Sequence, residues 1–416
     1  MTTPPHLAEL VLTPVTPERT EEFLGAAMHG FYHEYEPESW APGRAVFEAE
    51  RNFGFTVDDR WVTTCCAYSR TLTVPGGSVP AAAVTFVTVH PSYRRRGLLR
   101  RMMEHQLTGI AERCTEPVAL LWATEAEIYG RYGYGQATSL IHVSGATLGT
   151  AFRADVDLGS GSVAEVDAAE WLSVAEELHA RLLPERVGAL DRPRPWWEWM
   201  MNDHPSRRNG SSAYRYALHH PAAGEPDGFL AFRTRTGSSG IFEPGVEVRV
   251  TTLDAVEDSA RAALWRFALD LDLVRSFSAV VAYDDPLRLQ VADQASVKAE
   301  VADGTFIRLV DVARALEERR YAAEVDLVLE VRDALLPQNA GRFRLQGGPD
   351  GASVTRVQAG ADVALDVRDL GAVYLGGVSP TVVRRAGLLE ERTPGAATRM
   401  AAAFGWPSLP HCVDFF

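Results

Sequence analysis

The feature that most constrains the fold of this chain is a buried strand joined to an amphipathic helix by an arginine-rich turn. Ala81 to Val89 is an apolar run that predicts a buried strand, and Pro91 ends it because proline cannot continue a hydrogen-bonded ladder. From Leu98 to Cys114 the apolar residues recur with the 3.6-residue period of a helix. Val118 to Ala123 predicts a second buried strand. The succession of strand, turn, helix and strand predicts a mixed α/β fold.

The turn itself predicts an anion site. Residues 94–101 contain five arginines within eight positions, in a chain that is otherwise acidic. A strand that ends at Val89 and a helix that begins near Gly97 leave backbone N–H groups unpaired at the positive end of the helix dipole. Gly97 permits close approach of the backbone, so a pyrophosphate fits this turn. The alternative is that the arginines form only a solvated helix start.

Composition and charge limit the classes of function. The 416 residues include 41 Lys and Arg against 55 Asp and Glu, a net charge of −14. Such a balance argues against general binding of nucleic acid or of an anionic membrane surface, and it favours a cationic small molecule or peptide. No signal peptide and no apolar run of 18 residues is present, so we expect a cytoplasmic protein. The four cysteines form no C-x-x-C pair, so neither a disulfide framework nor a metal site is expected.

Three segments of distinct patterning predict three domains, at residues 1–146, 147–296 and 297–416. In the first, Pro75 to Ser78 predicts the turn of a hairpin. The second repeats the order of strands, helix and strand, beginning with a helix predicted over Ala164–Leu183, so a second copy of the first fold is expected. The third carries two predicted strands around an arginine- and glutamate-rich helix. It ends in a helix predicted over Pro394–Phe404 with Thr393 as its N-cap.

Two motifs near the N-terminus carry a family resemblance. Arg94-Arg-Arg-Gly97 resembles the acetyl-CoA motif Q/R-x-x-G-x-G/A of the GNAT N-acetyltransferases, although Leu99 stands where a small residue is usual. Together with the segment from Thr124 to Gly135, this turn resembles the Eis (enhanced intracellular survival) subfamily. The segment after Leu309 and the end of the chain also resemble that subfamily, so the similarity covers the whole chain.

The resemblance implies an α+β fold with tandem GNAT domains and a C-terminal domain like sterol carrier protein. It also implies a homohexamer that transfers acetyl groups from acetyl-CoA, without a metal, to amines such as those of aminoglycosides. The general acid matches Tyr129, and the general base is the α-carboxylate of the last residue, Phe416. The predicted cofactor-binding residues are Val87, Thr88, Val89, Arg94, Arg95, Arg96, Gly97, Leu98, Leu99, Arg100, Thr124 and Glu125.

The residues themselves are compatible with that mechanism. Many GNAT enzymes carry a glutamate on the cofactor strand, but Thr85 to Val89 contains no carboxylate, so the base must come from elsewhere. The apolar end Val413 to Phe416 is a credible source if it enters a core. A free α-carboxyl has a pKa of about 3.3–3.7 and is a poor base for an ammonium, unless burial raises that pKa or a water relays the proton. For Tyr129 the alternative is a packing role, which is the expected role of Tyr132 and Tyr134.

The acceptor pocket is expected to be acidic and aromatic, because such a pocket binds cations through charge and cation–π contact. The residues that match family pocket positions, or lie closest to them, are His33, Trp40, Phe86, Trp197 and Asp285. His33 stands opposite an acidic residue of the family, and Phe415 replaces a glutamate. These two changes leave aminoglycoside affinity and regiochemistry open. For Trp40 and Trp197 the alternative is that they are ordinary core aromatics.

The sequence leaves two other functions open. In the first, the natural acceptor is a polyamine or a lysine-containing peptide or protein, and acetylation of drugs is incidental. Otherwise the chain is a CoA-binding scaffold whose C-terminal domain binds a lipid or a partner.

Overall fold

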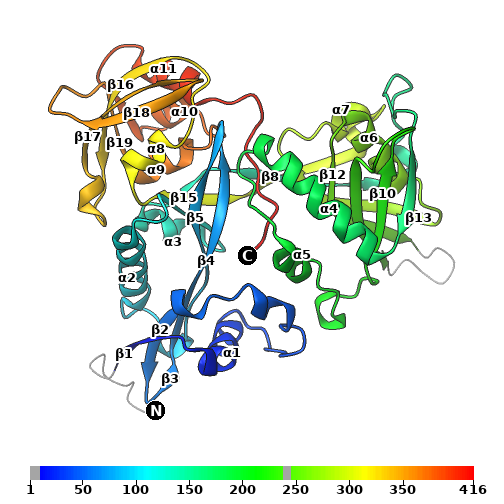
Figure 1. The fold of residues 1–416 in the computed structure, drawn as a ribbon, viewed down its shortest axis with the longest axis horizontal. Coiled ribbons are helices and arrows are strands. Elements are labelled where there is room, and N and C mark those ends of the chain that lie inside the picture. Colours follow the sequence, from blue (N-terminus) through cyan, green and yellow to red (C-terminus); the bar gives the residue numbers. More distant parts are fainter. Residues whose placement is uncertain (1–9, 238–244) are drawn as a thin grey trace. The chain divides into compact units, whose positions relative to one another are not determined.

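The computed structural model describes residues 10–237 and 245–416, and their contacts divide the chain into two units. Unit 1 consists of Met1–Thr138, Val187–Leu190 and Asp303–Phe416, and unit 2 of Ser139–Arg186 and Asp191–Ala302. The predicted mixed α/β class is confirmed (Figure 1). The boundaries expected at residues 146 and 296 stay a prediction, since contacts group the N- and C-terminal thirds of the chain together.

An eight-stranded sheet forms the N-terminal half of unit 1. The predicted hairpin is present, and its two long strands lie in the middle of the sheet. All pairings are antiparallel except that of β5 with β6, which α2 (Leu98–Arg113) connects. The strand order is β1 (Val11–Pro14), β2 (Phe53–Val57), β4 (Thr63–Val74), β5 (Gly77–Val89), β6 (Val118–Trp122), β15 (Thr305–Leu309) and β7 (Gly135–Gln136), with β3 (Arg60–Trp61) paired to β2.

The parallel pair β5–β6 separates before either strand ends. Its ladder joins Ala81–Val84 to Val118–Leu121 and goes no further, although β5 continues to Val89. On the other side of β5 the register with β4 shifts beside Phe86, whose φ of 47° lies in the left-handed region. A bulge of this kind bends the strand that carries it. The bend leaves backbone groups of β5 beyond Val84 without partners on β6.

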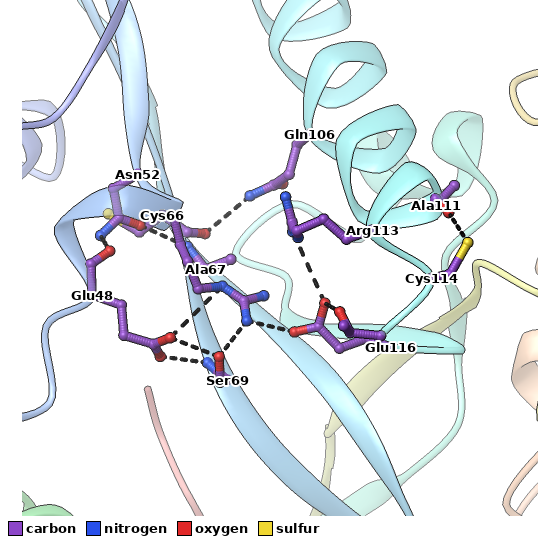
Figure 2. A network of polar contacts seen from close by, with 12 residues as sticks. Glu48, Asn52, Cys66, Ala67, Ser69, Gln106, Ala111, Arg113, Cys114 and Glu116 are labelled. Carbon is purple, nitrogen blue, oxygen red and sulfur yellow. Dashed lines mark hydrogen bonds and ion pairs between the residues drawn. The ribbon is translucent and has the colours of Figure 1, made fainter.

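A polar network fixes the outer side of β4 to the loop after α2 (Figure 2). The carboxylate of Glu48 accepts hydrogen bonds from the backbone N–H and the hydroxyl of Ser69, both at 2.6 Å. Arg51 donates to the same hydroxyl and lies 2.5 Å from the carboxylate of Glu116, which is only 4% exposed. Close to this network, the amide of Asn52 accepts a bond from the N–H of Ala67 at 2.9 Å. The network therefore pairs the mostly buried carboxylate of Glu116 with Arg51, which lies just before β2 in the chain.

A five-stranded sheet with helices forms the C-terminal part of unit 1. Its order is β18 (Gly351–Arg356), β17 (Gly341–Gly348), β16 (Val325–Arg332), β19 (Val363–Asp366) and β20 (Leu389–Glu391). The helices are α8 (Val312–Glu317), α9 (Val367–Val373), α10 (Pro380–Arg385) and α11 (Ala396–Phe404). The predicted N-cap Thr393 is wrong: Thr393 belongs to the preceding turn, and Gly395, with φ of 80°, is the N-cap of α11.

The core of this C-terminal part contains a fully buried arginine. The guanidinium of Arg319 lies 4.6 Å from the ring centroids of both Tyr321 and Phe404. It donates hydrogen bonds to the backbone oxygens of Tyr374 and Phe404, which lie at the ends of α9 and α11. Desolvation lowers the pKa of Arg319 from its ordinary value. Charged and aromatic side chains thus fill the space between these two helices.

Unit 2 repeats the order expected from the sequence around a seven-stranded sheet. That order is β14 (Val297–Asp303), β8 (Ser139–Ala146), β13 (Val274–Ala282), β12 (Val246–Ala255), β11 (Gly228–Thr236), β10 (Arg215–His220) and β9 (Ser162–Val166). β12 and β13 are parallel, and α6 (Asp258–Leu269) connects them. The helix predicted from Ala164 starts later, because its first residues belong to β9 and the carboxylate of Asp167 caps α4 (Ala168–Leu182). None of the helices described is long and apolar enough to cross a membrane.

Candidate active site

A cavity of about 960 Å³ opens in unit 1 where β5 leaves β6. It contains every predicted cofactor-binding residue except Arg96, together with the predicted acid Tyr129. Arg96 lies beside it, with its guanidinium 5.4 Å from the ring centroid of Tyr93. Sequence reasoning missed several other lining residues, which are Gly30, Phe31, Tyr32, Tyr93, Glu104, Ile128, Arg131, Ala334 and Leu335.

The arginine-rich turn has the backbone geometry of an anion site. Arg95 and Gly97 adopt left-handed φ values of 60° and 75°, and Gly97 is the N-cap of α2. The first helical hydrogen bond runs from the N–H of Arg101 to the oxygen of Gly97, so the preceding N–H groups have no intrahelical partner. A Cβ built on Gly97 meets no atom within 4 Å. The start of α2 thus offers free N–H groups and open space to a phosphate.

These features fit acetyl-CoA. A pyrophosphate finds N–H groups and arginines at the start of α2, and an extended amide-bearing arm finds unpaired backbone on β5. The equivalent turn of unit 2 has a different character, since Glu257 and Asp258 begin α6 there. Carboxylates at that position repel a phosphate, so the site belongs to the N-terminal copy of the fold.

Tyr129 ends a short helix, α3 (Ala126–Tyr129), and its side chain lines the cavity. Its ring lies edge-on to that of Tyr134, with centroids 6.2 Å apart. Burial raises the pKa of Tyr129 well above its ordinary value, with smaller contributions from Cys65, Tyr132 and Glu125. The phenol is therefore protonated at neutral pH and can donate a proton. Tyr132 and Tyr134 are buried in the core as expected, although Tyr132 also reaches the cavity.

The C-terminus of the chain reaches the same strand. Phe416 is 7% exposed, and one oxygen of its carboxylate accepts a hydrogen bond of 2.8 Å from the hydroxyl of Thr85. In Figure 1 the last segment of the chain, drawn in red, leaves α11 and returns to the β4–β5 hairpin. β5 begins to line the cavity at Val87. Thr85 lies two residues earlier, a separation of about 7 Å along a strand. Apart from its hydroxyl in a largely apolar strand, nothing in the local pattern pointed to Thr85.

An aromatic wall connects the cavity to the region of the carboxylate. The ring of Phe86 lies 6.4 Å from that of Phe31 and 5.5 Å from that of Trp40. Trp40 is 9% exposed and also contacts Tyr35, with ring centroids 6.3 Å apart. Of the expected acceptor residues, the structure thus brings Trp40 and Phe86 together. His33 is exposed on the loop that connects α1 (Thr20–Gly30) to Trp40.

The two acceptor residues expected in unit 2 have partners within that unit. Trp197 is fully buried and packs edge-on against Trp171, with centroids 5.7 Å apart. The carboxylate of Asp285 pairs with Arg261 and accepts the N–H of Leu287 at 2.9 Å. Both side chains therefore stabilise unit 2, and their role in acceptor binding stays a prediction.

No group of three or more potential metal ligands from His, Cys, Asp and Glu is found within residues 10–237 and 245–416. This observation concerns the described residues alone.

Comparison with known proteins matches both copies of the fold and the third domain. Residues 12–137 and 188–309 each match a family model described as an acetyltransferase (GNAT) domain. Residues 312–413 match a sterol carrier protein domain. The tandem GNAT domains and the C-terminal domain expected from the resemblance are confirmed.

The relatives include proteins described as N-acetyltransferases. An uncharacterized N-acetyltransferase from Streptomyces avermitilis is 41% identical over 384 residues, which span 90% of this chain and 92% of the relative. N-acetyltransferase Eis of Mycobacterium bovis is 34% identical over 341 residues, 80% of each chain. The crystal structure of Eis1 from Mycobacterium abscessus superposes with a TM-score of 0.83 at 32% identity, over 98% of this chain and all of that one. These similarities, which span 80% to 98% of the chain, show that it belongs to the Eis family of GNAT N-acetyltransferases.

Proposed function

We propose that this enzyme transfers the acetyl group of acetyl-CoA to primary amines of cationic acceptors such as aminoglycosides. Tyr129 is the general acid and the terminal carboxylate of Phe416 is the general base. The observation that carries this proposal is the hydrogen bond between Thr85 and the carboxylate of Phe416. This hydrogen bond supports a catalytic carboxylate beside β5, although the segment from Thr85 to Val89 contains no Asp or Glu.

The proposed reaction needs two proton transfers. The bound acetyl-CoA supplies an acetyl thioester, whose C–S bond breaks as the amine nitrogen forms a C–N bond. The carboxylate of Phe416 takes a proton from the attacking amine, and the phenol of Tyr129 gives one to the departing sulfur. Because burial raises the pKa of Tyr129, the phenol still holds its proton at the pH of the reaction.

The acceptor side is supported by rings and charge. Phe31, Trp40 and Phe86 offer aromatic faces beside the strand that holds the carboxylate. Aromatic faces attract ammonium groups, and the net charge of −14 favours the approach of a polycation.

A thiol-release assay with purified protein, acetyl-CoA and a panel of amines tests this function. The panel contains an aminoglycoside, a polyamine and a lysine-containing peptide, and mass spectrometry counts the acetyl groups added. Acetylated aminoglycoside supports the proposal, whereas exclusive acetylation of the peptide overturns the acceptor class. Tight binding of coenzyme A with no amine acetylated overturns the enzyme function.

The base is tested by extending the C-terminus with two residues, which moves the α-carboxylate away from Thr85. Turnover should be lost while acetyl-CoA binding is unchanged. The same two residues added at the N-terminus provide the control. Unchanged turnover in the C-terminally extended protein removes the carboxylate from the mechanism.

A further inference from the structure

The last residues of the chain are bound by the first two residues beyond the parallel ladder. The ladder of β5 and β6 ends at Val84 and Leu121, and the next residue on each strand is Thr85 and Trp122. The hydroxyl of Thr85 donates to the carboxylate of Phe416 at 2.8 Å. The indole Nε1–H of Trp122 donates to the backbone oxygen of Asp414, also at 2.8 Å.

The C-terminal tail lies extended where it meets these strands. Asp414 is 1% exposed, Phe415 71% and Phe416 7%, which is the alternation of an extended segment. The exposed ring of Phe415 lies 5.8 Å from the indole of Trp122. Further back, the N–H of His411 donates to the oxygen of Val187 at 2.9 Å. Chain termini ordinarily fray, so an ordered end of this kind needs such attachments.

We propose that Thr85 and Trp122 are positioning residues that hold this tail between the diverging strands and orient its terminal carboxylate for catalysis. The proposal rests on the proposed function, because it assigns the base its support. Thr85 occupies one carboxylate oxygen and leaves the other to accept the proton of the amine. Trp122 fixes the backbone two residues earlier, so that Phe416 enters the protein while Phe415 stays outside.

The two residues divide this task between different atoms. Loss of the Thr85 hydroxyl frees the carboxylate to rotate while the tail stays attached through Trp122. Loss of the indole N–H frees the tail itself. The two variants are therefore expected to differ: the first affects chemistry, and the second affects chemistry and the accessibility of the terminus.

Replacement of Thr85 tests the orientation of the carboxylate. Thr85→Val keeps the shape of the side chain and removes the donor, and we expect kcat to fall about tenfold or more with the KM for acetyl-CoA within about twofold. Thr85→Ser restores the hydroxyl and should recover most of kcat. Thr56→Val is the matched control, because the hydroxyl of Thr56 bonds Thr13 at 2.8 Å on β2, away from the tail. A kcat for Thr85→Val equal to that of Thr56→Val overturns the proposal.

Carboxypeptidase digestion followed by intact-mass measurement tests the attachment without using activity. The native protein should lose Phe416 slowly, and Trp122→Phe, which keeps a ring for Phe415, should lose it about tenfold faster or more. Equal rates overturn the role of Trp122, provided the thermal midpoint of the variant shows it folded. Deletion of Phe416 separates the two proposals. If that deletion leaves turnover intact, the proposed base is wrong. If it abolishes turnover while Thr85→Val and Trp122→Phe behave as native, only the positioning role of Thr85 and Trp122 is wrong.

Discussion

The guanidinium of Arg308 lies 2.6 Å from the carboxylate of Asp333, and both side chains are shielded from solvent, with exposures of 0% and 1%. Arg308 belongs to β15 in the eight-stranded sheet, whereas Asp333 directly follows β16 of the C-terminal sheet. The other carboxylate oxygen of Asp333 accepts the N–H groups of Leu335 and Leu336, at 3.1 and 3.0 Å. Since Leu335 lines the cofactor cavity, a buried ion pair connects the C-terminal sheet to the wall of that cavity.

Replacement of Asp333 should therefore affect both stability and cofactor use. Asp333→Ala leaves the Arg308 charge buried without its partner, so we expect the free energy of unfolding to fall by about 3–5 kcal/mol. The loop that carries Leu335 also loses its two backbone bonds, so the KM for acetyl-CoA should rise. Denaturant unfolding and steady-state kinetics measure the two effects.

The matched control for Asp333 is Asp326, which pairs with Arg344 at the same distance of 2.6 Å but with exposures of 50% and 46%. Solvent-exposed pairs contribute little, so Asp326→Ala should change the free energy of unfolding by less than about 1 kcal/mol. Equal losses for the two variants contradict the importance of the buried pair.

Gly97→Ala tests the phosphate site at the start of α2. The methyl group meets no protein atom within 4 Å, so it enters the open space assigned to the pyrophosphate. We expect acetyl-CoA binding to weaken roughly tenfold or more, in addition to backbone strain of about 1 kcal/mol. Calorimetric titration with coenzyme A measures the affinity.

Gly210 separates strain from obstruction. Its φ is 77° against 75° for Gly97, and a Cβ there also meets no atom within 4 Å, but it lies in unit 2. Gly210→Ala should therefore cost similar stability with no change in coenzyme A affinity. If both variants bind coenzyme A as the native protein does, the start of α2 is not the phosphate site.

The sequence was sufficient for those parts of the site that follow from local patterning. The apolar run to Val89, the glycine at position 97 and the helical period after Leu98 each have one physical explanation, and the structure places all three as expected. The helix start at Ala164 was wrong because a short amphipathic strand and the first turn of a helix have similar composition. Thr393 was a plausible N-cap by residue type, but the left-handed φ of Gly395 decides where α11 begins.

Contacts between distant segments were beyond the reach of local patterns. β15 joins the N-terminal sheet, and the cavity wall at Leu335 and the pair of Arg308 with Asp333 depend on this pairing. Nothing in the five residues of β15 predicts which sheet it joins. The hydrogen bond from Thr85 to Phe416 joins residues 331 positions apart. A burial requirement for the apolar C-terminus was predictable from its composition, whereas its partner was not.

Glu116 tests the polar network of Figure 2. Glu116→Gln removes the charge that faces Arg51 at 2.5 Å in a site where the two side chains are 4% and 12% exposed. The largely buried guanidinium then keeps only Glu48, 3.9 Å away, as a charged partner, so we expect the free energy of unfolding to fall by about 3 kcal/mol. Thermal and urea unfolding measure the change. Glu112→Gln on exposed α2 surface is the control and should change it by less than about 0.5 kcal/mol, and a similar small effect at Glu116 contradicts the expectation.

Tyr129→Phe tests the general acid. The variant keeps the ring that packs on Tyr134 and removes only the hydroxyl, so kcat should fall by about 10²–10⁴-fold while coenzyme A affinity is unchanged. Because burial raises the pKa of Tyr129 above its ordinary value of about 10, the phenol of the native enzyme keeps its proton throughout an assay between about pH 7 and 9.5. Ionisation of Tyr129 therefore causes no decrease of kcat in that range. Any alkaline decrease of kcat in the native enzyme should also be present in Tyr129→Phe. Tyr132→Phe, at a buried ring beside the same cavity, is the control and should retain most of kcat. A Tyr129→Phe enzyme with native kcat, or a Tyr132→Phe enzyme with the larger loss, assigns the proton donor to another group.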